Sequence, residues 1–364
     1  MFSSSDHEYM AQAIRLAKRG LYTTDPNPRV GCVIVKDGKV IAEGWHEKAG
    51  EAHAEVNALK VAGDNAKGAT VYVTLEPCCH QGKTPPCTDA LIKAGVSRVV
   101  AAMQDPHDKV AGQGLNTLQQ AAIETQVGLM QVQAEQLNPG FIKRMKTGRP
   151  YVRAKLAMSV DGRTAMASGE SKWITSDAAR ADVQHWRARS SVIMTGVGTV
   201  LADDPSMTAR VNGGEAATTR VVIDSNLSMP ETAKMLSLPG NTIIMTTCEE
   251  EDEITRLQNA GAEIFDVPAN HGGVDLAAVL DELGKEEFNE VLLETGSTLN
   301  GAMLQAGLID EMIIYMAPVL IGSEARPLFR LPGLDTMQQK INLEISDVRM
   351  FGKDMRIIAR PVIE

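Results

Sequence analysis

The sequence predicts two separate α/β domains in one chain, and three observations support this fold class. The chain has 364 residues, well above the roughly 150 residues of a typical single domain. In both halves, short apolar runs that suit strands alternate with amphipathic segments that suit helices. Residues 138–150 are basic and contain two prolines and two glycines, as domain boundaries do. We place the boundary near Thr147, which gives domains 1–147 and 148–364.

Composition excludes several classes of protein. The hydrophobic fraction of 44% and the charged fraction of 23% are ordinary for a globular chain, and no apolar run approaches the 18 or so residues of a membrane span. The net charge of −10 disfavours a polyanionic partner. Three of the five cysteines fall within 78–87, which suggests a metal or catalytic site rather than disulfides. The N-terminus has no export signal, so we expect a cytoplasmic protein.

The first domain begins with an amphipathic helix. Residues Ser5 to Glu8 fit the S-x-x-E capping box, and apolar residues recur at helical spacing until Gly20. Asp37-Gly38 separates two apolar runs, 30–35 and 40–42, and predicts a tight β-hairpin. The elements expected further along are strands at 70–75 and 98–103, and helices at 54–62 and 88–94, the last closed by Gly95.

The second domain repeats the alternation over a longer stretch. Its expected strands are short apolar runs, at 151–158, 191–195, 220–224, 242–246, 264–267, 290–294 and 312–316. Its expected helices lie at 177–189, 250–260 and 276–283. This order again indicates a layered α/β fold.

A candidate zinc site lies in the first domain. His53-Ala54-Glu55 leads into an expected helix, Cys78 follows Pro77, and Cys87 starts another helix. One imidazole and two thiolates supply three tetrahedral ligands and leave a fourth position for water, as in catalytic zinc sites. Zinc lowers the pKa of such a water to about 7. Glu55 can then carry the water's proton to a leaving group.

The order of these residues matches H-x-E followed by P-C-x-x-C, the signature of zinc-dependent nucleobase deaminases. Here eight residues rather than two separate the two cysteines. Cys79 is an alternative ligand to Cys78, and His80 as a fourth ligand would make the site structural. The cysteine directly after Pro77 is our preferred ligand. Because a purely structural site does not require Glu55, the sequence favours a catalytic one.

Further motifs extend over both halves of the chain. In the first half they are TDPNPRVG at 24–31, HAE at 53–55, TLEPC at 74–78 and GKTPPC at 82–87. In the second half they are KLAMSVDGR at 155–163, GESKWIT at 169–175, GTVLADDP at 198–205 and GLIDE at 307–311. Together these motifs resemble those of the bifunctional deaminase/reductase of bacterial riboflavin biosynthesis. The resemblance covers essentially the whole chain.

For the first domain, the resemblance implies a three-layer fold similar to cytidine deaminase. The implied reaction removes the 2-amino group of 2,5-diamino-6-(5-phosphoribosylamino)pyrimidin-4-one. Hydroxide at the zinc attacks the ring carbon, and Glu55 protonates the departing ammonia. His53, Cys78 and Cys87 would hold one zinc ion per chain. The positions that match the family's substrate contacts are Asn27, His46, Lys83 and Asp105.

The second domain contains two glycine-rich turns after expected strands. Gly196-Val197-Gly198 follows the strand at 191–195, but Leu201 stands where a third glycine would complete a dinucleotide-binding fingerprint. A second turn, 296–301, follows the strand that ends at Glu294. Its backbone amides could hold a pyrophosphate at the start of the next helix.

The resemblance implies a reductase similar in fold to dihydrofolate reductase. NADPH would deliver hydride to C1 of the ring-opened ribose, giving 5-amino-6-(5-phosphoribitylamino)uracil. The positions that match cofactor contacts are Ala157, Trp173, Thr199, Asp203, Gly296, Ser297, Thr298, Leu299, Asn300, Gly301 and Ala302. The positions that match substrate contacts are Ser171, Arg187, Met207, Arg210 and Glu294.

The chemistry of these positions suits the implied roles. Arg187 and Arg210 can clamp a phosphate, and Glu294 can accept hydrogen bonds from sugar hydroxyls. Asp203 is a candidate proton-handling group. Thr295 departs from the pattern, because family members often have glycine or alanine there.

Two other functions are alternatives. One is a deaminase of nucleic-acid bases with an unrelated C-terminal domain, and the other is a zinc-stabilised binding module without catalysis. The net charge of −10 and the aromatic content of 4% disfavour the first, and Glu55 disfavours the second. We expect a homo-oligomer, with a dimer favoured, that takes a small phosphorylated pyrimidine and binds neither nucleic acid nor membrane.

Overall fold

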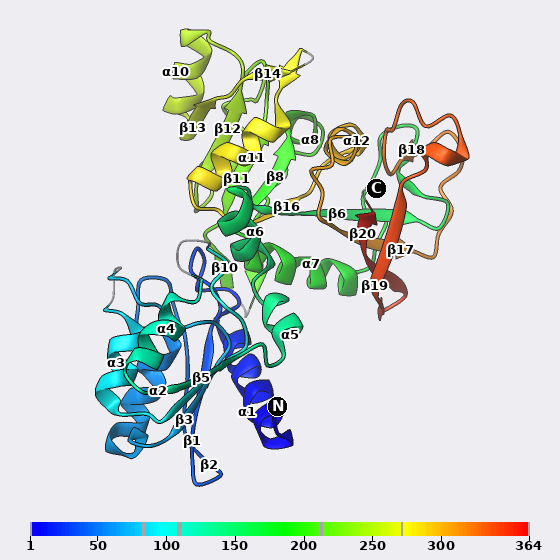
Figure 1. Cartoon of the computed structure of the whole chain (residues 1–364). Coiled ribbons are helices and arrows are strands. Elements are labelled where there is room, and N and C mark those ends of the chain that lie inside the picture. Colours follow the sequence, from blue (N-terminus) through cyan, green and yellow to red (C-terminus); the bar gives the residue numbers. More distant parts are fainter. Residues whose placement is uncertain (1, 82–84, 108–110, 212–213, 271, 363–364) are drawn as a thin grey trace. The chain divides into compact units, whose positions relative to one another are not determined.

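The computed structural model describes residues 2–81, 85–107, 111–211, 214–270 and 272–362, and the chain divides into two compact units, Met1–Arg149 and Pro150–Glu364 (Figure 1). Each unit has its own sheet and its own hydrophobic core. The segment expected to be a boundary is mostly helix α6 (Pro139–Thr147), which belongs to the first unit. Pro139 stands in the first turn of this helix and Gly148 ends it with a positive φ. The two units divide directly after it, between Arg149 and Pro150.

The first unit contains a five-stranded sheet in the order β2-β1-β3-β4-β5. Its strands are β1 (Gly31–Lys36), β2 (Lys39–Trp45), β3 (Thr70–Val73), β4 (Arg98–Ala101) and β5 (Glu124–Val127). β1 pairs antiparallel with β2 and β3, whereas β3, β4 and β5 run parallel. The predicted hairpin is present, with positive φ at both Asp37 and Gly38.

Helices cover both faces of this sheet. They are α1 (Ser4–Ala17), α2 (Ala54–Ala62), α3 (Cys87–Ala94), α4 (Gln113–Gln120), α5 (Gln131–Glu135) and α6, with 3-10 turns at Lys18–Gly20 and Gly63–Ala66. A Cβ at Gly31 would lie 2.0 Å from the carbonyl oxygen of Ala13 in α1, and one at Gly44 would lie 2.4 Å from that of Ala54 in α2. Gly44 pairs with Cys32, the neighbour of Gly31, so the two glycines face opposite sides of the sheet. The unit therefore has three layers.

The N-terminal cap of α1 differs from the prediction. Ser3 rather than Ser5 is the N-cap, and its Oγ accepts a hydrogen bond from the Asp6 N–H at 3.1 Å. The Asp6 carboxylate accepts from the Ser3 N–H at 2.7 Å, from the Tyr72 hydroxyl at 2.6 Å and from Arg98 at 2.9 Å. Contacts with β3 and β4 thus select a different capping register from the one that local sequence favours.

The second unit is built on a nine-stranded sheet in the order β13-β12-β11-β8-β16-β6-β17-β20-β19. Its strands are β6 (Tyr151–Ser159), β8 (Val192–Gly196), β11 (Thr219–Ile223), β12 (Thr242–Thr246), β13 (Ala262–Asp266), β16 (Glu290–Leu293), β17 (Glu311–Ala317), β19 (Asn342–Phe351) and β20 (Asp354–Val362). Every strand predicted for this unit is present, and neighbouring strands from β13 to β17 run parallel. The sequence did not predict the antiparallel hairpin β19–β20.

Short strands and helices complete the second unit. The short strands are β7 (Arg163–Ala165), β9 (Ala209–Val211), β10 (Gly214–Ala216), β14 (Ala269–Asn270), β15 (Gly273–Val274) and β18 (Arg326–Pro327). The helices are α7 (Asp177–Arg189), α8 (Val197–Asp203), α9 (Lys234–Ser237), α10 (Glu251–Asn259), α11 (Leu276–Lys285), α12 (Ser297–Gln305) and a 3-10 turn at Met337–Gln339. α7 has its predicted bounds, whereas the glycine segment after β8, expected as a turn, opens helix α8.

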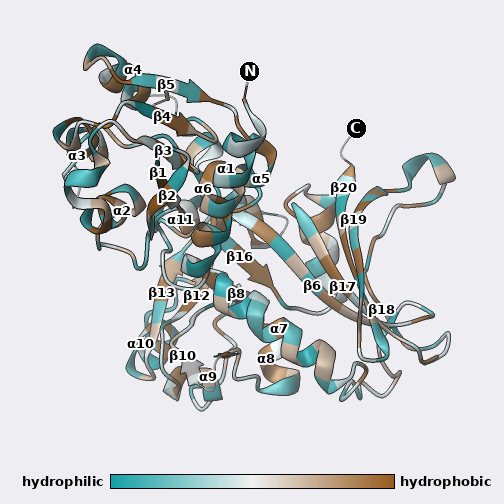
Figure 2. Ribbon diagram, turned by 90° about the horizontal axis from the view of Figure 1, so that it is seen from below, coloured by the Kyte–Doolittle hydropathy of each residue, from teal (hydrophilic) through white to brown (hydrophobic). Residues whose placement is uncertain are grey.

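The central strands of the second unit's sheet are buried on both faces. Val192 and Met194 of β8 face a core that includes residues of α11 and α12, whereas Ile193 faces one that includes residues of α8 and α10. Figure 2 shows β16, near the centre of this sheet, as a hydrophobic strand. Within the described ranges, no helix is long and apolar enough to cross a membrane.

The strand order reverses direction at β16. From β6 the chain continues to β8 and then adds β11, β12 and β13 in turn toward one edge of the sheet. It then crosses back, and β16 lies between β8 and β6. Ligands of α/β sheets bind outside the carboxyl ends of strands where the order reverses in this way. The carboxyl ends of β8, β16 and β6 are therefore the first place to look for a site in this unit.

Candidate functional site

Three potential metal ligands converge in the first unit. His53 is the N-cap of α2, Cys78 follows β3, and Cys87 is the first residue of α3. Their ligand atoms lie within 4.8 Å of one another, and His53 Nδ1 is 3.2 Å from Cys87 Sγ and 3.6 Å from Cys78 Sγ. Zn–S bonds of about 2.3 Å and Zn–N bonds of about 2.0 Å hold tetrahedral ligands about 3.5–3.8 Å apart. The donor set and spacing fit zinc.

The structure separates the alternative ligands from this group. Cys79 and His80 are not members of the ligand cluster found in the described part of the chain, so Cys78 is the cysteine that faces His53. A hydrogen bond from the Cys87 thiol, together with one from His53, lowers the pKa of Cys78 to about 4 despite its burial. The contact with Cys78, together with burial, raises the pKa of Cys87. The pair therefore already favours one thiolate.

Glu55 lies beside the ligands, in the first turn of α2. Its side chain is buried, and burial is the main reason why its pKa rises to about 7, with a further contribution from the negative charge of Cys78. The Glu55 carboxyl also interacts with the Cys87 thiol. A carboxyl group in this position can hold or release a proton near neutral pH.

Two of the expected substrate contacts lie next to a metal ligand. The ring of His46 packs edge-on against that of His53, with centroids 5.4 Å apart. His46 Nδ1 donates to the Ala52 carbonyl at 3.1 Å, and His46 Nε2 accepts from Asn27 Nδ2 at 3.1 Å. Burial lowers the pKa of His46. The structure thus brings Asn27 and His46 together at the ligand cluster.

Of the other two expected substrate contacts in this unit, the structure describes only Asp105. Asp105 is half-buried in the segment after β4, and its carboxylate accepts from the His107 N–H at 2.8 Å. Burial raises the pKa of Asp105. Lys83 lies outside the described residues.

In the second unit, Arg187 and Glu294 form a buried ion pair. Arg187 Nε and Nη2 donate to the two Glu294 oxygens at 2.6 and 2.9 Å, and Nη1 donates to the Thr208 carbonyl at 3.0 Å. Three of the N–H groups that would clamp a phosphate are therefore engaged within the protein. In this arrangement Arg187 orients Glu294 at the carboxyl end of β16.

Lys155 completes this charged group and was not among the expected site residues. Its Nζ lies 3.9 Å from Glu294, and burial lowers its pKa. Burial alone would raise the pKa of Glu294, but Arg187 and Lys155 bring it down to about 2. The carboxylate therefore stays ionised. A lysine inside the apolar strand β6 was the available sequence signal.

The two glycine segments are neighbours at the carboxyl ends of β8 and β16. Thr295 Oγ1 accepts a hydrogen bond from the Gly196 N–H at 3.3 Å, and the Asn300 side chain donates to the Thr295 carbonyl at 2.9 Å. A Cβ at Gly196 would lie 3.3 Å from the Leu299 side chain. Thr295, the departure from the family pattern, thus links the segment before α8 to the start of α12.

The remaining expected residues of this unit lie on several different elements. Ala157 lies near the end of β6, and Thr199 and Asp203 lie on α8, where Asp203 is 3.7 Å from Lys172 Nζ. Trp173 is 71% exposed, and the Arg180 guanidinium lies 4.5 Å from its ring centroid. Met207 is buried, Arg210 is exposed on β9, and Ser171 lies in the segment before α7. Among the residues that the structure describes, neither Trp173 nor Arg210 makes a hydrogen bond or ion pair with Glu294.

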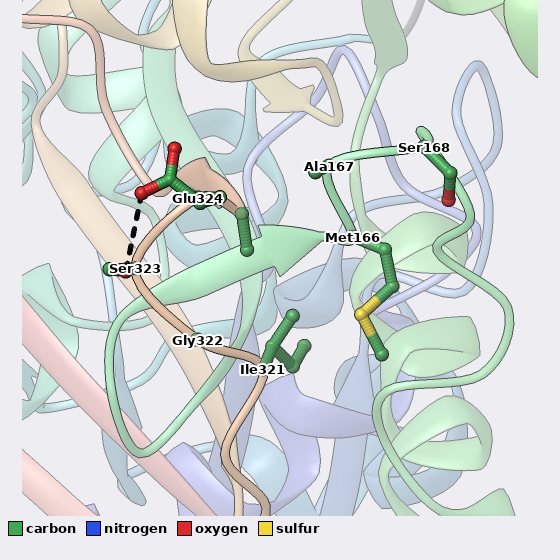
Figure 3. Close-up of a pocket in the computed structure, with 8 residues that line it drawn as sticks. Met166, Ala167, Ser168, Ile321, Gly322, Ser323 and Glu324 are labelled. Atoms are coloured by element: carbon green, nitrogen blue, oxygen red, sulfur yellow. Dashed lines mark hydrogen bonds between the residues drawn. The ribbon is translucent and has the colours of Figure 1, made fainter.

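A hollow of about 570 Å³ also lies in the second unit (Figure 3). Residues 166–168 and 321–325 line it, and none of the expected site residues is among them. The Asp161 carboxylate holds one side of it by accepting from the N–H groups of Ile321 at 3.2 Å and Gly322 at 2.8 Å. The hollow is therefore separate from the charged group around Glu294.

Two family models match the two halves of the chain. The family model described as RibD C-terminal domain matches residues 150–357, and the one described as cytidine and deoxycytidylate deaminase zinc-binding region matches residues 3–103. Riboflavin biosynthesis protein RibD of Escherichia coli strain K12 is 51% identical over 362 residues, which cover 96% of this chain and 98% of that protein. RibD of Haemophilus influenzae is 46% identical, over 99% of this chain and 98% of the relative.

Solved structures show the same similarity over the full length. Acinetobacter baumannii RibD, form 2, superposes with a TM-score of 0.91 at 47% identity and covers 98% of this chain and 99% of its own. A diaminohydroxyphosphoribosylaminopyrimidine deaminase/5-amino-6-(5-phosphoribosylamino)uracil reductase from Thermotoga maritima has a TM-score of 0.87 at 31% identity, with coverages of 98% and 99%. The chain therefore belongs to the RibD family of bifunctional deaminase/reductases of riboflavin biosynthesis, with a cytidine deaminase-like N-terminal domain and a dihydrofolate reductase-like C-terminal domain.

Proposed function

We propose that the first domain deaminates 2,5-diamino-6-(5-phosphoribosylamino)pyrimidin-4-one, and that the second reduces the product with NADPH to 5-amino-6-(5-phosphoribitylamino)uracil. The Thermotoga maritima relative is named for this pair of activities. The observation that carries the proposal is the buried Glu55 beside the cluster of His53, Cys78 and Cys87, in one chain with a reductase domain.

In the deaminase, the protein's own residues move the proton and orient the base. Zinc held by the three ligands would lower the pKa of a water molecule to about 7. Glu55 would take a proton from a water held there and deliver it to the departing amino group. The bond between His46 and Asn27 fixes the Asn27 amide, and we assign Asn27, His46, Asp105 and Lys83 to substrate binding.

In the reductase, we place NADPH across the carboxyl ends of β6, β8 and β16. Bound NADPH supplies the hydride for C1 of the ribose. The backbone amides of 296–299 have no partner within α12 and suit its pyrophosphate. We assign Asn300, Gly301 and Ala302, in the next turn, to the same cofactor. We assign Ala157, Trp173, Thr199 and Asp203 to the same cofactor, with Asp203 also handling a proton.

Glu294 recognises the sugar in this proposal. Held ionised by Arg187 and Lys155, its carboxylate is a strong acceptor for ribose hydroxyls. Arg210, which is exposed on β9, takes the phosphate. Ser171 and Met207 complete the substrate contacts.

We also propose that the protein is a homodimer, joined through an apolar face of the edge strand β19. Leu343, Ile345, Val348 and Met350 are between 44% and 59% exposed. They pair with residues 361, 359, 357 and 355 of β20, so they share one face of the sheet. An apolar stripe on an edge strand suits pairing with a second copy.

The proposed reactions are tested by supplying the substrates in sequence. Purified protein is incubated with the diaminopyrimidine nucleotide, and NADPH is added afterwards. We expect ammonia release first, and NADPH consumption only once ammonia has been released. Ammonia release from tRNA or DNA instead of the nucleotide would favour the base-deaminase alternative.

A further inference from the structure

Glu76 is a buried carboxylate directly before the Pro77-Cys78 turn, and the mechanism above does not use it. All of the hydrogen bonds described for its carboxylate come from backbone N–H groups. Oε2 accepts from Asp105 at 3.0 Å and Gly112 at 2.9 Å, and Oε1 accepts from Gly114 at 2.8 Å and Leu115 at 3.2 Å. Since a carboxylate has about four acceptor sites, these bonds saturate it.

These donors include the N-terminus of α4. Gly114 and Leu115 lie in its first turn, where backbone N–H groups have no partner within the helix. A negative charge at this end also complements the helix dipole. Glu76 therefore replaces the missing side-chain cap of α4, although it lies 38 residues before Gly114 in the chain.

Backbone packing joins the same two segments. The Glu76 N–H donates a hydrogen bond to the Met103 carbonyl at 2.9 Å. Met103 lies two residues before Asp105, in the segment that joins β4 to α4. A Cβ at Gly114 would lie 2.0 Å from the Pro77 carbonyl oxygen, so α4 starts directly against the turn that carries Cys78. The metal-ligand turn and the start of α4 are thus in direct contact, with Glu76 at their centre.

One of the residues bound by Glu76 is Asp105, an expected substrate contact. The Asp105 N–H is fixed by Glu76, and its side chain is aimed by the bond from the His107 N–H at 2.8 Å. Asp105 is therefore oriented at both its backbone and its side chain.

We propose that Glu76 is a positioning residue for deamination: it fixes the backbone at Asp105 and at the start of α4 against the Cys78 turn, so that Asp105 meets the pyrimidine in one place. This inference rests on the proposed deaminase function. It assigns Glu76 no contact with substrate or metal, because its acceptor sites are taken by the backbone.

The test compares Glu76→Gln and Glu76→Ala with Asp6→Asn. Glutamine keeps one acceptor oxygen and turns the other into a donor, so one pair of bonds is lost, whereas alanine loses all four. Asp6 is a matched control, because it is a buried carboxylate of the same unit whose bonds go to Ser3, Tyr72 and Arg98. Zinc content and reductase turnover on the deaminated intermediate are measured alongside.

We expect Glu76→Gln to raise the KM for the diaminopyrimidine nucleotide about tenfold or more, with kcat within about threefold, because a displaced contact loses its alignment. Glu76→Ala should raise the KM further. Zinc content and reductase turnover should stay at the wild-type level. Asp6→Asn should lower the melting temperature and leave KM unchanged.

An unchanged KM in both Glu76 variants would overturn the proposal, and so would loss of zinc from Glu76→Gln, which would make Glu76 a support of the ligand turn. If Glu76→Ala does not fold, amide hydrogen exchange of Glu76→Gln decides. One pair of amides, either Asp105 with Gly112 or Gly114 with Leu115, should exchange faster than in the wild type, and unchanged exchange of all four contradicts the role. Failure of the wild type to release ammonia refutes the proposed function instead, and the exchange experiment does not depend on it.

Discussion

Arg187 and Glu294 meet in a bidentate ion pair, with N–O distances of 2.6 and 2.9 Å, although 107 residues separate them in the chain. Their side chains are 17% and 12% exposed. The guanidinium fork matches the carboxylate in both shape and charge. The pair makes Glu294 a fixed, ionised acceptor at the carboxyl end of β16.

Replacing Arg187 by lysine should weaken the reductase. Lysine cannot form the fork, so Glu294 loses its orientation and part of its charge compensation. We expect the free energy of unfolding to fall by about 2–4 kcal/mol, as when a largely buried pair is broken, and reductase kcat/KM to fall about 100-fold. Denaturant unfolding and steady-state kinetics measure the two effects.

Arg349→Lys is the matched control for this change. Arg349 forms an ion pair with Asp347 but is 66% exposed, so its replacement should cost less than about 0.5 kcal/mol. Ammonia release should be unaffected in both variants. Equal effects of the two substitutions would contradict the role assigned to Arg187.

The ionisation of Glu294 should make the stability of the second unit depend on pH. Its folded-state pKa of about 2 lies below the usual 4.5. The ionised form is thus favoured on folding, so its stabilisation is complete above pH 4.5 and is lost as the pH falls toward 2. The shift corresponds to about 3 kcal/mol at most.

Glu294→Gln isolates this contribution from that of other carboxylates. The wild type should exceed the variant in unfolding free energy at pH 7, and this difference should shrink between pH 4.5 and 2. Thermal unfolding of both proteins across this range is the measurement. A difference that stays constant with pH would show that Glu294 does not titrate as described.

Metal removal should separate the two activities. His53, Cys78 and Cys87 belong to the first unit, whereas the charged group around Glu294 belongs to the second. A chelator should therefore stop ammonia release but leave NADPH-dependent reduction of the deaminated intermediate unchanged. Added zinc should restore ammonia release. Elemental analysis should find one zinc per chain. Parallel loss of both activities would speak against independent sites.

Charged residues on β19 should dissociate the proposed dimer. Ile345→Glu combined with Val348→Glu places two carboxylates on the exposed apolar face. Val132→Glu is the control, because Val132 is equally exposed, at 61%, but lies on α5. Sedimentation should give a monomer for the double variant and a dimer for the control. A double variant that still sediments as a dimer would place the interface elsewhere.

Helices with a clear local sequence pattern could be predicted, whereas a strand pair with an irregular register could not. α2 and α7, for example, have their predicted bounds. The hairpin β19–β20 was missed because a bulge between Ile345 and Asp347 shifts the strand register. Ile345 and Val348 consequently share a face although they are three residues apart, which hides the period-two pattern of a strand.

The same distinction holds for the sites. The zinc ligands lie in short motifs whose residue types reveal the chemistry, so they could be predicted. The partners of Glu76 are backbone amides 29 to 39 residues away, and backbone groups leave no trace in the sequence. The engagement of Arg187 by Glu294 was likewise invisible, because only the folded sheet brings α7 to the end of β16.

The most direct test of the account is Glu55→Gln, measured for both activities. Glutamine keeps the size of Glu55 but cannot accept and deliver a proton, so ammonia release should fall at least about 100-fold. Zinc content and reduction of the supplied deaminated intermediate should match the wild type. Ammonia release at the wild-type rate by a zinc-loaded Glu55→Gln protein would contradict the central claim that this buried carboxyl drives the first of two reactions.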